Sequence, residues 1–367
     1  MKTPPARLHV VGVIAATVTA MCASAGASAQ SSVTLSGIVD AAARHVNNEG
    51  RGSVSSLVSG SNSTSRIAVR GNEDLGDGLS AGFHLEHGLL LDAGTAASTT
   101  LFWDRRSTVS LLSRTLGELR LGRDFVPTYV NWSRYDPFSY VGVAGANNFV
   151  SATPAGPIRS AYGTGGNTTV RSSNSIQYLL PSGFGGLEGG VMVAAGEAGS
   201  AANGQHKVMG ARLGFATSGW GISVAHTRTE NDLTVAGSHK DSAVGVNVAL
   251  AGLKLTAAFR AFSYDQAKQR NLLIGAVVPV GAVGEVKASV HRANMSGRVG
   301  ATLIDENDAT QVGLGYVHNL SKRTALYTTL SRISNSGAAA FVVPGGPAGM
   351  AGGGNSSGFE AGLRHTF

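Results

Sequence analysis

The feature that most constrains the fold of this chain is the alternation of polar and apolar residues. This pattern occurs in short segments that recur along the chain up to its last residue. The stretch Ser65–Gly88 is the clearest example. In its first arm Ile67 and Val69 share one face. Arg66, Ala68 and Arg70 share the opposite face. The connection Asn72–Gly78 is rich in Asn, Asp and Gly, which tolerate the backbone of a tight turn. Alternation with a period of two predicts a pair of antiparallel strands.

The same pattern predicts about sixteen strands along the chain. Besides the two arms of Ser65–Gly88, we expect strands at Val33–Asn47, Leu101–Ser113, Gly117–Phe125, Arg171–Leu180, Leu187–Gly196, His206–Thr217, Trp220–Glu230, Ser242–Leu250, Leu253–Tyr264, Leu272–Val280, Gly284–Met295, Gln311–Leu320, Thr324–Ser334 and Ser357–Phe367. A Gly/Ser-rich loop up to Thr64 follows the first strand, and the long segment Val126–Val170 breaks the rhythm.

The connections between these strands alternate in length. Short turns such as Asn319–Arg323 alternate with long Gly/Ser/Asn-rich loops such as Asn335–Ser356. Strands of ~10 residues can cross a bilayer, and lipid cannot satisfy the backbone groups of an open sheet edge. We therefore expect an all-β fold, a transmembrane antiparallel β-barrel with lipid outside. With about sixteen strands its lumen is too wide to be filled by side chains and becomes an aqueous channel.

The start of the chain predicts export. A basic segment, an apolar run from Leu8 and the small-residue motif Ala27-Ser28-Ala29 are typical of a cleaved signal peptide, residues 1–29. The barrel then occupies 30–367. Cys22 is the single cysteine, so the exported chain has no disulfide to hold it together.

Charge and motifs narrow the function. The net charge is +7, but the basic residues are scattered singly, which argues against nucleic acid and favours small anions or lipopolysaccharide as partners. The sequence has no G-x-S-x-G, H-E-x-x-H or phosphate-binding loop, so we expect no enzyme activity, no cofactor and no metal. Calcium at the loop tip Ile304–Asp308 stays an open alternative. So do a substrate-specific channel, disfavoured by an aromatic share of 6%, and a surface adhesin or β-solenoid, disfavoured by the lack of a fixed repeat.

Several stretches carry a family resemblance. The start SSVTLSGIVDAA, the hairpin SRIAVRGNEDLGDGLSAGFHLEHG, GELRLGRDF, SNSIQYLLPSGFGG and the last strand GFEAGLRHTF resemble the general porins of Gram-negative bacteria, of the beta-proteobacterial type. The resemblance implies a sixteen-stranded barrel in the cell outer membrane, a homotrimer, and a third extracellular loop, Val126–Val170, that folds inward. It also implies that Phe367 is read by the barrel-assembly machinery. The chain departs from the family at Ser36, where an aromatic is usual, and in the loop, where Tyr135-Asp136-Pro137-Phe138 replaces a Pro-Glu-Phe-Gly-like motif.

The same resemblance implies a ladder of arginines facing loop carboxylates at the pore constriction. The matching positions are Arg66, Arg171 and either Arg105 or Arg106. Alternation independently turns Arg66 and Arg171 inward. For the remaining position alternation favours Arg106 and the resemblance favours Arg105, and a bulge would reconcile the two, so both are kept. Further candidates for the constriction are Arg70 and Arg120, with Asp136 as the loop acid and Glu118 and Asp124 as inward acids of the wall.

The charge pattern predicts ion preference. Arginine stays protonated under all relevant conditions, and a wall of arginines raises the local concentration of anions in a narrow aqueous neck. We therefore expect a water-filled channel for passive diffusion of small hydrophilic solutes and ions, with a preference for anions.

Overall fold

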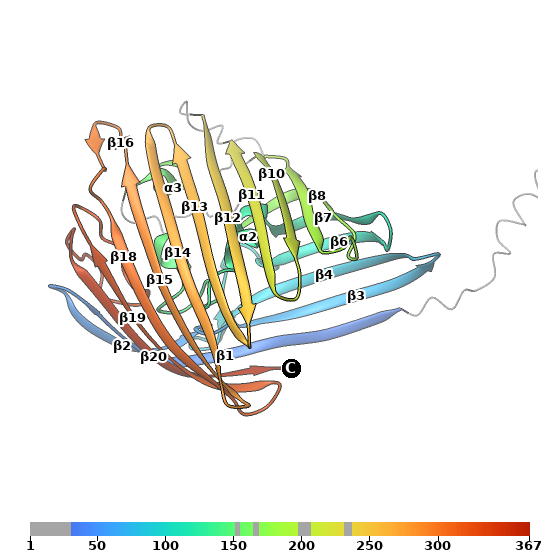
Figure 1. Cartoon of the computed structure of the whole chain (residues 1–367), viewed down its shortest axis with the longest axis horizontal. Helices are drawn as coiled ribbons and strands as arrows, with labels where there is room; N and C mark the ends of the chain where they lie inside the picture. Colours follow the sequence, from blue (N-terminus) through green and yellow to red (C-terminus); the bar gives the residue numbers. More distant parts are fainter. Residues whose placement is uncertain (1–30, 151–154, 164–168, 197–206, 231–236) are drawn as a thin grey trace, which may run out of the picture.

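The protein is nearly all β and forms a closed barrel of tilted strands (Figure 1). The structure, a computed structural model, describes residues 31–150, 155–163, 169–196, 207–230 and 237–367. The predicted signal peptide, 1–29, lies outside the described residues. None of the helices in the described ranges is long and apolar enough to cross a membrane.

Sixteen strands make up the closed ring, and every neighbouring pair is antiparallel. In ring order they are β1 (Ser32–Asn48), β3 (Arg66–Gly76), β4 (Leu79–Leu90), β6 (Arg106–Ser113), β7 (Gly117–Phe125), β8 (Arg171–Leu179), β9 (Leu187–Ala194), β10 (Lys207–Ala216), β11 (Trp220–Glu230), β12 (Ser238–Leu250), β13 (Leu253–Tyr264), β14 (Ala267–Val280), β15 (Gly284–Ser296), β18 (Ala309–Asn319), β19 (Thr324–Asn335) and β20 (Asn355–Thr366). The short strands β5 (Thr95–Ala96), β16 (Arg298–Val299) and β17 (Thr302–Leu303) lie in connections.

The ring closes between β1 and β20. The two strands pair from Ile38↔Thr366 to Asn48↔Ser356. At the chain end, Gly37 and Phe367 exchange two backbone hydrogen bonds of 3.1 Å each. The Phe367 ring lies over Gly37, where a Cβ would come within 2.4 Å of the ring. The last residue therefore belongs to the seam that removes the edges of the sheet.

One predicted loop is wrong. Residues Gly52–Ser59 form a strand, β2, which pairs with the second half of β1 from Ala41 to Asn48. The first half of β1 pairs instead with β3. The prediction failed because the small and polar residues of β2 carry little alternation, while the partner strand β1 supplies the pairing. Similarly, β6 begins at Arg106 rather than at Leu101.

The two faces of the wall differ as the alternation predicts. In β11, Trp220, Ile222 and Val224 are 43 to 49% exposed, while the intervening Ser223 and Ala225 are buried. Exposed Val, Leu, Ile and Phe recur in this way around the barrel. An apolar surface of this extent is typical of contact with lipid. We call the opposite face, which carries the buried small and polar residues, the inner face.

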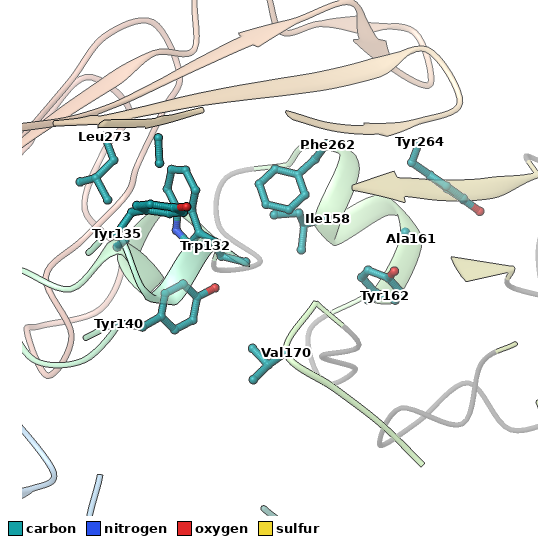
Figure 2. Close-up of a cluster of buried hydrophobic side chains, with 13 residues drawn as sticks. Trp132, Tyr135, Tyr140, Ile158, Ala161, Tyr162, Val170, Phe262, Tyr264 and Leu273 are labelled. Atoms are coloured by element: carbon teal, nitrogen blue, oxygen red, sulfur yellow. The ribbon is translucent and has the colours of Figure 1, made fainter. Parts of the chain in front are cut away.

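Described residues of the segment Val126–Val170 contact the inner face. The segment contains α2 (Pro127–Ser133), the 3-10 helix η1 (Ala146–Phe149) and α3 (Pro157–Tyr162), short helices that the alternation did not predict. Their apolar side chains form a cluster with Phe262 and Leu273 of the wall (Figure 2). The Tyr135 ring lies over Gly245 of β12, where a Cβ would come within 2.2 Å of it. The glycine in the wall therefore allows the close approach of this segment.

Candidate functional site

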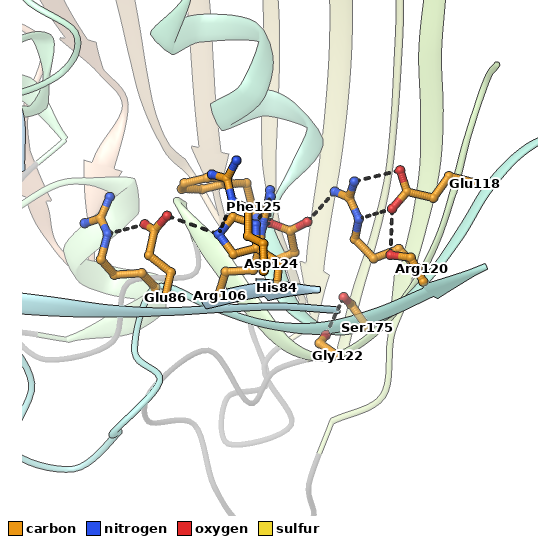
Figure 3. A network of polar contacts seen from close by, with 12 residues as sticks. His84, Glu86, Arg106, Glu118, Arg120, Gly122, Asp124, Phe125 and Ser175 are labelled. Atoms are coloured by element: carbon orange, nitrogen blue, oxygen red, sulfur yellow. Dashed lines mark hydrogen bonds and ion pairs between the residues drawn. The ribbon is translucent and has the colours of Figure 1, made fainter. Parts of the chain in front are cut away.

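The inner face of β3, β4 and β6–β8 carries a ladder of arginines and carboxylates (Figure 3). Its centre is Asp124 at the end of β7. Arg106 donates to Asp124 Oδ1 from Nε at 2.8 Å. Arg120 reaches Oδ2 of the same carboxylate at 2.6 Å and Glu118 Oε1 at 2.7 Å. The pairing of β7 with β8 shifts here by one residue, because Ser173 and Asn174 of β8 lie opposite Arg123 alone.

A second group surrounds Glu86 of β4. Arg105 Nε lies 2.5 Å from Glu86 Oε1, and Arg66 Nε lies 3.7 Å from Oε2. His84, on the same strand, lies 3.5 Å from Oε2 and also contacts Arg106 at 3.0 Å. Arg105 and Arg106 are both part of the ladder, because Arg105 precedes the first paired residue of β6 and is free of its strict alternation. The sequence left open whether Arg105 or Arg106 belongs to the ladder, and in the structure both do.

Arg171 packs against an aromatic ring. Its guanidinium carbon lies 4.4 Å from the centre of the Phe125 ring, a cation–π contact. Its Nε is buried and has no hydrogen-bond partner within the described residues. No carboxylate in the described part of the chain forms an ion pair with it. Like Arg70, Arg171 therefore carries a charge that no carboxylate among the described residues pairs with.

Arg70 extends the ladder toward the start of β1. Its Nε lies 3.3 Å from His84 Nε2. Arg70, Arg106, Arg120 and Glu118 line a cavity of about 520 Å³ with polar residues of β1 and β6. The arginines of the ladder are Arg66, Arg70, Arg105, Arg106, Arg120 and Arg171, and its carboxylates are Glu86, Glu118 and Asp124. The basic residues thus outnumber the acidic ones two to one.

Asp136 does not belong to this ladder, contrary to the expectation for the loop acid. It is 5% exposed and accepts hydrogen bonds from the backbone N–H groups of Phe138 at 2.9 Å, Tyr140 at 2.9 Å and Ala146 at 2.8 Å. Burial raises the pKa of Asp136, and the three N–H groups oppose that rise. The carboxylate holds together a turn in which Ser139 and Tyr140 have positive φ. It shapes the segment, and no ion pair joins it to an arginine of the ladder within the described residues.

Other ion groups lie outside the predicted set of site residues. Arg134, at the end of α2, contacts Glu188 of β9, which also pairs with Arg212 of β10 at 2.9 Å. On the opposite part of the wall, Arg44 and Glu360 are 2.9 Å apart and are buried. Alternation places Glu188 and Arg212 on the inner face, so the sequence predicts the face on which each side chain lies. It does not predict that the two side chains form an ion pair.

The Arg44–Glu360 pair also fixes the segment Val126–Val170. Glu360 Oε1 accepts a hydrogen bond of 3.3 Å from the backbone of Val143. Arg44 donates to Ser61 Oγ at 2.8 Å, in the stretch between β2 and β3. Tyr135 OH reaches Ser223 Oγ of β11 at 2.5 Å, and Thr128 Oγ1 reaches Asp241 of β12 at 2.7 Å. The segment is thus held at several points on the inner face.

Two carboxylates of the loop tip Ile304–Asp308 accept hydrogen bonds from backbone N–H groups of the protein. Asp305 accepts from the Gly297 backbone at 3.0 Å, and Asp308 accepts from the Met295 backbone at 3.1 Å. Within the described residues, no cluster of three or more His, Cys, Asp or Glu is arranged to hold a metal ion.

Comparisons with known proteins agree with this architecture. A family model described as Gram-negative porin matches residues 15–338. The chain is 36% identical over 370 residues to outer membrane porin protein 32 of Delftia acidovorans, covering 95% of this chain and 97% of that protein. It is 32% identical over 135 residues to an outer membrane porin protein of Bordetella pertussis, covering 37% of this chain and 31% of that protein.

Among solved structures, an anion-selective porin from Comamonas acidovorans matches with a TM-score of 0.79 at 33% identity, covering 92% of this chain and 100% of that chain. OmpF of Salmonella typhi matches with a TM-score of 0.61 at 15% identity, covering 91% of this chain and 97% of that chain, which shows a shared fold. Together with the closed barrel and its polar inner face, these matches show that the chain belongs to the Gram-negative porin family and is an outer-membrane channel for small solutes.

Proposed function

We propose that this porin is a general diffusion channel that prefers anions. The observation that carries the proposal is the ladder, in which arginines outnumber carboxylates and Arg171 has no acidic partner among the described residues. The related porin from Comamonas acidovorans is described as anion-selective. Passage is passive, so the side chains of the ladder act through their field and no catalytic step is involved.

In this proposal, the segment Val126–Val170 folds into the lumen of the barrel and narrows it. Its contacts support this role, because α2 packs against β9–β12 and α3 against β12–β14. The wall formed by β3, β4 and β6–β8 then remains open toward the lumen, with the arginines along it. Ions pass between the segment and this wall, where the arginines are closest to the path.

The field of the ladder accounts for the preference. An anion that loses part of its hydration in the neck interacts with fixed guanidinium groups, while a cation is repelled by them. Glu86, Glu118 and Asp124 neutralise part of this charge and hold the arginines in place. Screening limits the range to ~8 Å at physiological ionic strength, so the charges nearest the neck decide the preference.

The channel assembles as a homotrimer through β1, its neighbours and β20. Val33 and Leu35 on the outer face of β1 are 70% and 59% exposed, which supports an apolar contact there. Export uses the signal peptide 1–29, and the barrel-assembly machinery reads the terminal Phe367. Native mass measurement in mild detergent tests the trimer, and the detection of monomer alone would contradict it.

Deletion of Phe367 tests the assembly signal. It should reduce the amount of folded porin in the outer membrane.

Recording in a planar bilayer tests the ion preference. With a KCl gradient across the bilayer, the zero-current potential should have the sign of chloride preference at low salt and shrink at high salt. A potential with the sign of potassium preference would overturn the proposal. Flux of neutral sugars that rises linearly with concentration is expected for a general channel, whereas saturation would favour the substrate-specific alternative.

A further inference from the structure

His84 of β4 lies where the two charged groups of the ladder meet (Figure 3). Its Nδ1 lies 3.0 Å from Arg106 Nη1, and its Nε2 lies 3.5 Å from Glu86 Oε2. Arg70, directly opposite on β3, donates from Nε to His84 Nε2 at 3.3 Å. Among the described histidines, His84 is the one that contacts arginines of the ladder. A charge on its imidazole ring would therefore add directly to the charge of the ladder.

The ring of His84 is accessible from the lumen. It lines the cavity of about 520 Å³ described above, and its side chain is 13% exposed. The charged residues that line this cavity with it are Arg70 of β3, Arg106 of β6, and Glu118 and Arg120 of β7. β1 contributes uncharged hydroxyl groups, from Ser32, Thr34 and Ser36, and Thr108 of β6 lies opposite His84. Protons of the lumen can thus reach a ring that is surrounded mainly by guanidinium groups.

The contacts of His84 fit a neutral ring that carries its proton on Nε2. Arginine can only donate hydrogen bonds, and a neutral imidazole has one accepting nitrogen and one N–H group. With the proton on Nε2, the ring accepts from Arg106 at Nδ1 and turns its N–H toward the Glu86 carboxylate. A second proton would occupy Nδ1, and two donors would then face each other. Protonation of His84 therefore changes the contact with Arg106 as well as the charge.

We infer that His84 determines the ion preference of the channel through its proton, so that acidification strengthens the preference for anions. This inference rests on the proposed function, in which the field of the ladder acts on the passing ions. Histidine is the side chain that ordinarily changes its charge between about pH 5 and pH 8. Carboxylates ordinarily titrate below this range and arginines above it. The charge of the ladder therefore changes at His84 while its other charges stay constant.

The sign of the effect follows from the contacts. A proton on His84 adds one positive charge to the wall of the lumen. Arg106 then loses the acceptor of its Nη1, while its Nε and Nη2 stay 2.8 Å and 2.7 Å from Asp124 Oδ1. This arginine keeps its place and gains a free N–H group for an anion. One charge ~5 Å from the path of the ions changes the ratio of chloride to potassium permeability about fourfold at low salt.

The test is the zero-current potential under a KCl gradient at low salt, measured at about pH 8 and at about pH 5. The bilayer is phosphatidylcholine, which has no net charge over this range. H84Q keeps an acceptor for Arg106 and cannot gain a proton, and H84N serves if H84Q does not fold. The matched control is H226Q, because His226 lies on the outer face of β11, where its Nδ1 is 2.8 Å from Ser242 Oγ. Folding of each variant is checked by heat-modifiable migration.

In the wild type and in H226Q, the ratio of chloride to potassium permeability should rise about fourfold from the higher to the lower pH, and less than twofold at ~1 M salt. In H84Q the ratio should be the same at both pH values. A wild type without this rise, or a rise that persists in H84Q, would overturn the inference.

The sign of the potential at the higher pH tests the proposed function separately. A channel that prefers potassium there would contradict the proposed anion preference. A rise of its chloride-to-potassium ratio on acidification that is lost in H84Q would still support the role of His84.

Discussion

Neutralising Arg171 is the sharpest test of how the ladder works. Arg171 lies on the Phe125 ring, with its centre 4.4 Å from the guanidinium carbon, and no carboxylate among the described residues forms an ion pair with it. Its replacement by Gln therefore removes one positive charge without leaving an acid unpaired. This distinguishes it from Arg120, whose removal would leave Glu118 and Asp124 without their shared partner.

The magnitude follows from Coulomb's law. For an ion passing at ~5 Å in an aqueous neck, one unit charge contributes ~0.8 kcal/mol, which screening over a Debye length of ~8 Å reduces to ~0.4 kcal/mol. Chloride loses this attraction and potassium loses the matching repulsion, so the ratio of their permeabilities changes by ~0.9 kcal/mol, or about fourfold. At 1 M salt the Debye length is ~3 Å and the change falls to less than twofold.

The assay is the zero-current potential of R171Q under a KCl gradient at low and at high salt. R171K is the matched control, because it keeps the charge and loses the planar stacking on Phe125. It should retain most of the chloride preference. A folded R171Q channel whose permeability ratio equals that of the wild type at low salt would refute the reasoning, since a ladder charge without a carboxylate partner would then have no effect on the ions.

Three further changes test other parts of the site. The variant E86Q removes the acid shared by Arg66 and Arg105, so chloride preference should rise by about the same fourfold factor; a fall would show that Glu86 is needed mainly to hold the arginines. The variant G245V should push the Tyr135 ring away from the wall, because a Cβ there comes within 2.2 Å of it. Single-channel conductance should decrease with the ion preference retained, and unchanged conductance would contradict the close packing. The variant R44A leaves Glu360 buried without its partner, at 1% exposure of the Glu360 side chain, and should lower the free energy of unfolding by about 3 kcal/mol. A lower temperature of heat-modifiable migration measures this loss, and R44K should lose less.

The sequence by itself determined the strands. Gly117–Phe125, Trp220–Glu230 and Leu253–Tyr264 are strands with the predicted bounds. Alternation is a local property of each segment, because side chains of a strand point to opposite faces whatever its partners are. The same property predicted that Arg66 lies on the inner face, where it contacts Glu86, whereas the irregular pairing between Ser172 and Ser175 interrupts the alternation beside Arg171. The number of strands and the apolar outer face then predict a closed barrel, because only a closed sheet pairs all backbone N–H and C=O groups in lipid.

Only the tertiary structure decided which inner-face side chains meet. Alternation gives the face of a residue but not its height along the barrel, which depends on the stagger of neighbouring strands. Arg105 joins the ladder because β6 begins one residue later, and Glu86 becomes the partner of two arginines through the pairing of β4 with β3 and β6. Three backbone N–H groups of its own segment, rather than an arginine of the ladder, bind the carboxylate of Asp136 among the described residues. The local pattern therefore fixed the wall and its polarity, while long-range pairing and the fold of one long segment arranged the charges that face the solute.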